Sequence, residues 1–387
     1  MNHREINQLI PLAVVGVFFS MPLMCLLMII TALNEFVDEE DFRPRYYLYF
    51  LLALLPAMIN TTKPTAGSDL GYYYWLYEFA GTKTFAEYLA LIPKEPFYHI
   101  YNYIARILTF GDFRLFVVVT SLLMYLPVIF AFDIIVRKHE LDSRVAIYAS
   151  VILLLFPQYF IYTMQIVRQV LAGSIAFYCV VKSVYDNSKM ATIGVFCAGF
   201  IHASAFLFCI YYAFLWTKGW GLKSKLLLLA ICGVSFYTLL ETFSSLGMEN
   251  STLTYAARRG MAENTEIINV GLFPRLISLS ILPIGLLSAL KLQDDRFNTF
   301  ISASWIIAGF IILKWNTPLF VLRYMEYAYM FLPICVALFL VVYNKFRLLP
   351  LVAVIMSAYF ILSLFASNFT YIPLIEIALR GAIFYFI

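Results

Sequence analysis

The stretch Leu115–Phe132, LFVVVTSLLMYLPVIFAF, carries no charged side chain. An apolar run of about 18 residues is long enough to cross the hydrocarbon core of a bilayer as an α-helix. Similar runs recur from one end of the chain to the other. Because lipid offers no hydrogen bonds to the backbone, such runs cross it as helices. The sequence therefore predicts an all-α, polytopic integral membrane protein with roughly 10–13 membrane elements.

The composition agrees with this fold class. Of the 387 residues, 63% are apolar and only 13% are charged, whereas soluble domains are about a quarter charged. This excludes a soluble enzyme, a disordered chain and a fibrous protein. The net charge of +4 includes no basic tract suited to nucleic acid. The six cysteines lie in apolar runs without metal-ligand spacing, so we expect neither a structural zinc nor a disulfide framework. The sequence has no P-loop, HExxH or dinucleotide-binding motif, so we expect no cofactor.

Hydropathy and helix breakers divide the chain into spans. The predicted spans are residues 9–33, 46–60, 113–136, 145–164, 166–186, 222–243, 271–291, 297–315, 321–343 and 348–367. Three further apolar pieces fit a span poorly. Residues 97–110 are too few, residues 190–216 are too many, and residues 371–387 form an amphipathic pattern.

Lysine and arginine in short loops set the orientation, because such loops stay in the cytoplasm. The cationic loops are residues 137–144, 182–189, 218–225, 291–296 and 344–347. They share one side only if residues 190–216 enter and leave on that side, as a pair broken near 199–205. A single tilted span is the alternative, and it would move everything after residue 217 to the other face. We prefer the broken pair, which leaves loops 61–96 and 244–270 outside a single transmembrane domain, residues 1–387.

Three titratable groups beside apolar segments are candidates for a catalytic base: Asp69, Glu95 and His202. A charge at the bilayer centre costs about 2.5 kcal/mol or more, so each such group needs a partner or a role. Asp69 precedes an aromatic run that contains Tyr73, a composition typical of sugar-binding clefts, and is the leading candidate. The structural alternatives are helix capping by Asp69, dipole compensation by Glu95 and a packing hydrogen bond from His202.

The cationic residues assigned to the outside are mostly arginines. The planar guanidinium donates paired hydrogen bonds to phosphate, so these residues predict an anionic ligand. Snorkelling of Arg168 to the interface and neutralisation of Arg323 by Glu326 at i+3 are the structural alternatives. The residues assigned to substrate binding are Tyr73, Arg168, Gln169, Arg258, Arg275, Arg323 and Tyr324.

The ordered set of these motifs resembles the EpsG family, a branch of the Wzy-type O-antigen and capsule polymerases. The resemblance rests on Gly67, Asp69 and Tyr73, then Glu95-Pro96, then Arg168-Gln169 with Ala172, then Ile201–Ala205, and finally Arg323. Two positions depart from the family pattern. Lys63 stands where the family usually has arginine, and Ile201 stands where it usually has an aromatic residue.

This resemblance implies a GT-C-type glycosyltransferase of the bacterial inner membrane. Its substrates would be undecaprenyl-diphosphate-linked oligosaccharides, used as both donor and acceptor. The missing external Asp-x-Asp pair argues against a metal-dependent, nucleotide-sugar enzyme. The sequence does not specify whether a chain-length regulator binds. The alternatives are a lipid-linked oligosaccharide flippase and, with His202 in the membrane, an O-acyltransferase or a lipid-phosphate-sugar transferase.

Overall fold

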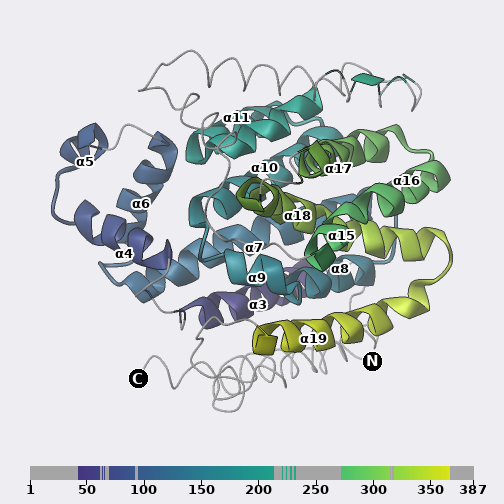
Figure 1. Ribbon diagram of the computed structural model, residues 1–387, viewed down its shortest axis with the longest axis horizontal. Helices are drawn as coiled ribbons and strands as arrows, with labels where there is room; N and C mark the ends of the chain where they lie inside the picture. Colours follow the sequence, from purple (N-terminus) through teal and green to yellow (C-terminus); the bar gives the residue numbers. More distant parts are fainter. Residues whose placement is uncertain are drawn as a thin grey trace. The chain divides into compact units, whose positions relative to one another are not determined.

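The computed structural model describes residues 42–61, 69–91, 95–212, 272–313 and 318–366, together with a few isolated positions such as Lys63 and Trp315 (Figure 1). Every regular element within these ranges is a helix. Four predicted segments lie wholly or mostly outside the described residues: the spans 9–33 and 222–243, the loop 244–270 and the amphipathic piece 371–387.

Five helices within the described residues are long and apolar enough to cross a membrane. They are α7 (Phe113–Lys138), α10 (Val167–Asp186), the pair α15 and α16 (Leu272–Leu279 and Ile281–Leu292), α17 (Asp295–Leu313) and α18 (Pro318–Val342). The prediction of an all-α polytopic membrane protein is confirmed.

The chain forms two compact units. Unit 1 comprises residues 1–85, 102–167 and 343–387, and unit 2 comprises residues 86–101 and 168–342. Because both units are assembled from separate segments, the chain passes between them several times. The single transmembrane domain inferred from the sequence stays a prediction.

In unit 1, α3 (Phe42–Asn60) packs along α7 and against α8 (Arg144–Leu154). Polar side chains join these apolar helices. Asn60 Nδ2 donates to Ser121 and Thr163, and the Tyr49 hydroxyl donates to Asp133 over 2.9 Å. α19 (Leu349–Ala366) covers α8 and the short α9 (Pro157–Tyr162).

The predicted span 145–164 is not one helix. α8 ends at Leu154, and α9 begins at Pro157, because proline suits the first turn of a helix but not its interior. With 11 residues, α8 is about 16 Å long and cannot cross a bilayer core of about 30 Å alone. The ammonium of Lys63 caps the end of α9, donating to the carbonyl oxygens of Phe160 at 2.6 Å and Ile161 at 3.2 Å.

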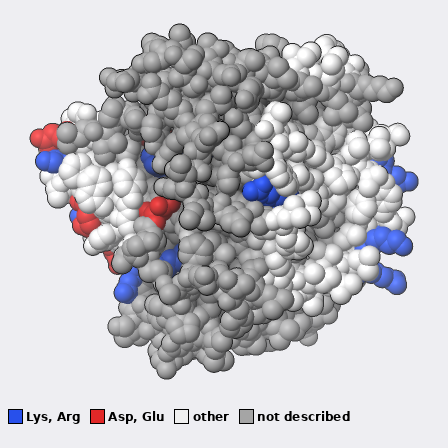
Figure 2. Space-filling view, in the orientation of Figure 1, with Lys and Arg blue, Asp and Glu red and all other residues white. Residues whose placement is uncertain are grey.

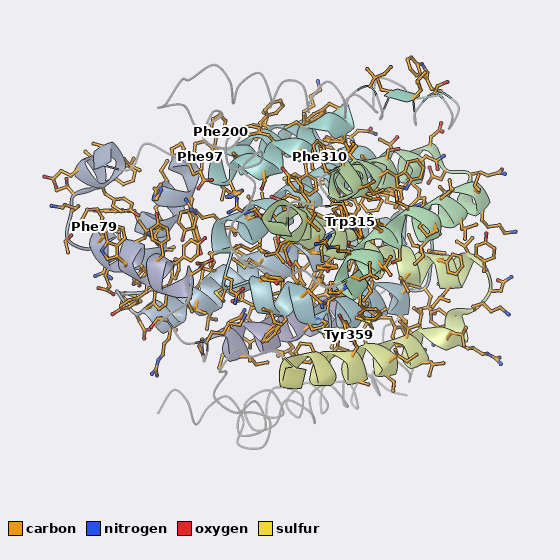
Figure 3. The ribbon with its side chains drawn as sticks, viewed as in Figure 1. Phe79, Phe97, Phe200, Phe310, Trp315 and Tyr359 are labelled. Atoms are coloured by element: carbon orange, nitrogen blue, oxygen red, sulfur yellow. The ribbon has the colours of Figure 1, made fainter. Side chains whose placement is uncertain are left out.

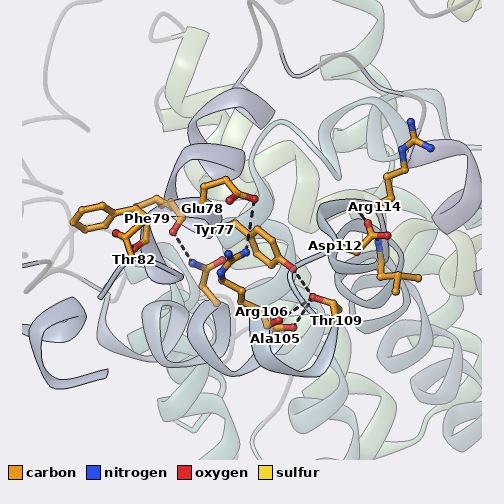
Figure 4. Close-up of polar contacts among 12 residues, drawn as sticks. Tyr77, Glu78, Phe79, Thr82, Ala105, Arg106, Thr109, Asp112 and Arg114 are labelled. Atoms are coloured by element: carbon orange, nitrogen blue, oxygen red, sulfur yellow. Dashed lines mark hydrogen bonds and ion pairs between the residues drawn. The ribbon is translucent and has the colours of Figure 1, made fainter. Parts of the chain in front are cut away.

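The predicted external loop 61–96 is largely helical. It contains α4 (Asp69–Ala80) and α5 (Phe85–Leu91), and α6 (Pro96–Leu108) begins at its end. In unit 1, α4 lies against the residues that follow. Tyr77 bonds to Thr109, and Arg106 pairs with Glu78 and lies over the Tyr77 ring (Figure 4). The piece 97–110 is therefore a short helix rather than a span.

In unit 2, α16, α17 and α18 pack on one another. α11 (Lys189–Ile201) ends at His202, whose extended backbone breaks the helix before the 3₁₀ helix η1 (Ala203–Ile210). The chain then returns along α11. Tyr212 stacks on Phe196 and donates its hydroxyl to the carbonyl of Thr192. The break predicted within 199–205 is confirmed, and residues 190–212 fold back on themselves as a pair of helices. Entry and exit of this pair on the same side of the membrane stays a prediction.

The ends of the helices agree with the grouping of the cationic loops. In unit 1, the Arg144 guanidinium lies 5.1 Å from the Phe346 ring centroid, so loops 137–144 and 344–347 are neighbours. In unit 2, Tyr185 near the end of α10 meets Phe300 near the start of α17, which brings loops 182–189 and 291–296 together. Which side of the membrane these ends occupy stays a prediction.

The outer faces of α15 and α16 are apolar. Leu272, Phe273, Leu276, Leu287 and Leu290 are each more than two-fifths exposed. In the space-filling view, most charged side chains of the described surface lie near the edges of the view, and few lie between them (Figure 2). Such a surface would be a liability in water but suits contact with lipid.

Candidate functional site

Glu95 lies at the centre of a charged cluster within unit 2. It directly precedes Pro96, the first residue of α6, and adopts a φ of 56°. The left-handed region costs an L-residue roughly 1–2 kcal/mol, so the surroundings must hold Glu95 in place. Its side chain is 12% exposed. Strain of this kind in a non-glycine residue is typical of functional sites.

Arg168 provides the cation that faces Glu95. It is the second residue of α10, and its Nη1 forms a short ion pair with Glu95 Oε2. The same guanidinium lies 5.9 Å from the ring centroid of the buried Tyr98. An arginine in the first turn of an apolar helix is thus held by a carboxylate and an aromatic face rather than by snorkelling towards water.

His202 faces the other oxygen of Glu95. Its Nε2 lies 3.6 Å from Glu95 Oε1. Its Nδ1 accepts a hydrogen bond from the Ser204 amide and lies 2.7 Å from the Ser204 hydroxyl. Because an amide can only donate, Nδ1 is the acceptor in this contact, and Nε2 is the ring nitrogen that presents a proton towards Glu95.

α18 contributes three further residues to the site, which are Arg323, Glu326 and Tyr327. The buried Tyr327 bonds through its hydroxyl to Ser204, which links α18 to His202. Gln169 on α10 donates to the backbone carbonyl of Arg323. Glu326, one turn further along α18, is fully buried. Two carboxylates, two guanidinium groups and a histidine therefore belong to one part of unit 2.

Burial dominates the electrostatics of Glu95. It raises the pKa of this carboxyl group above its ordinary value, because a charged carboxylate is poorly solvated there. Arg168, the Ala203 amide and Arg323 act in the opposite direction but do not cancel the effect of burial. A carboxyl group with a raised pKa next to fixed cations is typical of general acid–base sites.

The cluster lies near one end of unit 2. Arg168 in the first turn of α10 and Asp186 at its end are separated by about 27 Å along the helix axis. α11 starts at Lys189 and brings His202 back by about 20 Å towards Arg168. The site is therefore at the end opposite the cationic loops 182–189 and 291–296.

The chain matches the EpsG family over residues 46–376. It belongs to the EpsG family. Comparisons with curated proteins and with solved structures give no match. The residues of the cluster lie within the matched segment.

The structure of this EpsG chain brings together part of the set predicted from the sequence. Glu95, Arg168, Gln169, His202 and Arg323 all belong to the cluster. Phe97, two residues after Glu95, lies beside Phe200, two residues before His202, with ring centroids 5.4 Å apart (Figure 3). This aromatic contact joins the start of α6 to the end of α11.

Asp69 and Tyr73 belong to unit 1. Asp69 is the exposed first residue of α4, the position expected for helix-dipole compensation. Tyr73 is buried, and its ring meets Tyr72 edge-on. The exposed rings of α4 are instead Tyr72, Tyr74 and Trp75. The assignment of Asp69 and Tyr73 to the site stays a prediction.

The remaining predicted residues lie on later elements. Arg275 on α15 donates to the carbonyl oxygen of Trp315 at 2.7 Å, and its guanidinium lies over the Trp315 ring. Trp315 lies just before α18 (Figure 3). Tyr324 is buried and stacks on Phe310. Arg258 lies outside the described residues. Among the described residues, no three His, Cys, Asp or Glu side chains gather as metal ligands would.

Sequence reasoning missed two members of the site. Ser204 and Tyr327 look like an ordinary small packing residue and an ordinary interfacial aromatic. Their role depends on the hydrogen bond between their hydroxyl groups, and the two residues are 123 positions apart in the sequence. The sequence offered one signal. Ser204 is a small polar residue two positions after His202, and at this spacing an extended chain can form a local bond between a side chain and the backbone.

Proposed function

We propose that this protein is a polysaccharide polymerase that joins undecaprenyl-diphosphate-linked oligosaccharide repeat units at the periplasmic face of the bacterial inner membrane. Membership of the EpsG family supports a polymerase-type function. One observation carries the assignment to a site. Glu95, a buried carboxylate with a raised pKa, lies between Arg168 and His202 near one end of unit 2.

In the proposed reaction, Glu95 accepts the proton of the acceptor hydroxyl group. The oxygen of that hydroxyl attacks the anomeric carbon of the donor sugar. The bond from this carbon to the diphosphate oxygen breaks, and the lipid diphosphate leaves with the electron pair. A single displacement of this kind inverts the anomeric centre. Burial supports Glu95 over the exposed Asp69 as the base, because a raised pKa strengthens proton acceptance.

Arg168 and Arg323 would stabilise the departing diphosphate. Charge that develops in the transition state is stabilised by donors that are already fixed in place, and Arg168 is fixed by Glu95 and Tyr98. The Nε2 of His202, 3.6 Å from Glu95 Oε1, would help to orient the Glu95 carboxylate. We further assign Arg275 and Arg258 to the phosphates, and Tyr73, Tyr324 and Gln169 to substrate contacts.

The test is a polymerisation assay with the purified full-length protein in lipid vesicles. Lipid-linked repeat units extracted from cells that lack this protein serve as the only substrate. We expect a ladder of products, each longer by one repeat unit. A flippase would instead move the unit between leaflets without extending it, and that result would overturn the proposal.

A further inference from the structure

The second half of α6 and the turn after it place polar side chains inward and apolar side chains outward. Asn102 and Thr109 are 0% and 2% exposed, whereas Ile104, Ile107 and Leu108 are 48%, 62% and 68% exposed. Asn102 donates to the carbonyl of Leu76, and Thr109 bonds to Tyr77. The protein side of this segment is thus more polar than its outer side.

Such an arrangement is unfavourable in water. Each large aliphatic side chain left in water forgoes about 1.5–3 kcal/mol of transfer free energy. The outward face is therefore expected to meet an apolar medium. α6 has 13 residues and is about 20 Å long, too short to cross a bilayer core of about 30 Å. A short amphipathic helix with one apolar face suits the membrane interface.

Continuity with α7 places the end of α6 at a membrane surface. Phe110, which is 93% exposed, follows α6, and Asp112 then caps the first turn of α7 by accepting from the amides of Arg114 and Leu115. α7 is one of the helices apolar enough to span the membrane. The chain has only four residues between the two helices, so α6 ends where α7 enters the bilayer.

The aromatic residues of α4 point to the same environment. Tyr74 packs edge-on against Phe113 at the start of α7, with ring centroids 4.9 Å apart. Tyr72 and Trp75 are 46% and 54% exposed. Tyrosine and tryptophan are enriched at the level of lipid headgroups, where one part of the ring is apolar and the other is wet.

We propose that α6 lies in the plane of the membrane at the boundary of headgroups and acyl chains, with Ile104, Ile107, Leu108 and Phe110 inserted into one lipid leaflet. Glu95 directly precedes this helix. If the proposed function holds, the catalytic carboxylate is the residue from which this helix starts. The interfacial position itself does not depend on that function.

The experiment measures the depth of single spin labels in the full-length protein, reconstituted in phosphatidylcholine–phosphatidylglycerol vesicles. Cysteines replace Ile104, Ile107 or Leu108 in a background without the six native cysteines. Thr82, exposed in the turn after α4, is the control for water. Leu123, about 15 Å along α7 from its start, is the control for the bilayer core. Collision with oxygen and with a water-soluble nickel reagent reports the depth.

We expect labels at the three α6 positions to lie about 5–10 Å below the phosphate level, between the two controls. Accessibility to nickel equal to that at Thr82 would overturn the proposal. So would a depth equal to that of Leu123, which would indicate a span. Shielding from both reagents would indicate a covering protein segment or a second copy, and would also overturn it. The measurement needs no polymerase activity, so its failure is distinct from failure of the proposed function.

Discussion

At the scale of single residues, the pKa of Glu95 is the property that the proposed chemistry uses most directly. A base must be ionised, so kcat/KM should fall as the pH is lowered through the pKa of this group. Burial raises that pKa. We therefore expect half-maximal kcat/KM above about 4.3, the value of an unperturbed glutamate. The measurement is kcat/KM of the purified protein as a function of pH.

The Glu95→Gln variant is the control for this pH profile. Its residual activity should lack the acidic limb, because the titrating group is gone. An acidic limb that survives in Glu95→Gln, or a wild-type midpoint at or below about 4.3, would show that another group is the base.

Arg168 makes a second residue-scale prediction. Lysine keeps the charge but has no planar fork, so it cannot hold Glu95 and contact a phosphate in the same way. We expect Arg168→Lys to lose activity about tenfold to a hundredfold, which corresponds to the 1.5–3 kcal/mol of one charged hydrogen bond. Polymerisation by the purified variant is the measurement.

Arg106→Lys is the matched control for Arg168→Lys. Arg106 has the same exposed fraction, 24%, and also pairs with a glutamate, but it belongs to unit 1 and to none of the proposed contacts with substrate. It should keep near-normal activity. Wild-type activity in Arg168→Lys, or equal losses in both variants, would contradict the assigned role of Arg168.

The residues of the cluster were predictable from the sequence because each is a polar group that lipid would not tolerate. Their pairing was not predictable. The sequence favoured Asp69 over Glu95, and only the structure shows that Asp69 is exposed at the start of α4 whereas Glu95 is enclosed before α6. The cap of α9 by Lys63 was missed for the same reason, since it depends on a contact 97 positions away.

At the scale of elements, the approach of α10 to α18 depends on Gly173. A Cβ at this position would lie 2.4 Å from Cε1 of Tyr327, the residue that anchors Ser204 and His202. Gly173→Ala should destabilise the protein by about 1–3 kcal/mol through overpacking, although alanine is the better helix former. Thermal unfolding in detergent measures the change.

Gly309 in α17 provides the control, because a Cβ there meets nothing within 4 Å. Gly309→Ala should be neutral or stabilising by up to about 1 kcal/mol, the difference in helix propensity. If both alanine variants behave alike, close packing at Gly173 does not position Tyr327.

The apolar runs predicted that the elements are helices and where most of them lie. The excess length of residues 190–216 predicted the break at His202. One failure has a local cause. Pro157 divides the predicted span 145–164, whereas the predicted span 271–291 holds across the turn at Ser280. A hydropathy window averages over such short interruptions and therefore cannot resolve them.

At the scale of the whole molecule, orientation in the membrane is the open prediction. Thr82 lies in the predicted external segment and Glu140 in the predicted cytoplasmic loop 137–144, and both are exposed. A cysteine at Thr82 should react with a membrane-impermeant maleimide in intact spheroplasts. A cysteine at Glu140 should react only after lysis. The reverse pattern would invert the topology and place the site in the cytoplasm.

The most direct test of the central claim compares Glu95→Gln with Asp69→Asn in the polymerisation assay, with both proteins purified and shown to be folded. Glu95→Gln should extend lipid-linked repeat units about a hundredfold or more slowly than wild type, the usual cost of losing a general base. Asp69→Asn should stay within about tenfold of wild type. If Glu95→Gln keeps more than about a tenth of the wild-type rate while Asp69→Asn is inactive, the cluster around Glu95 is not the catalytic centre.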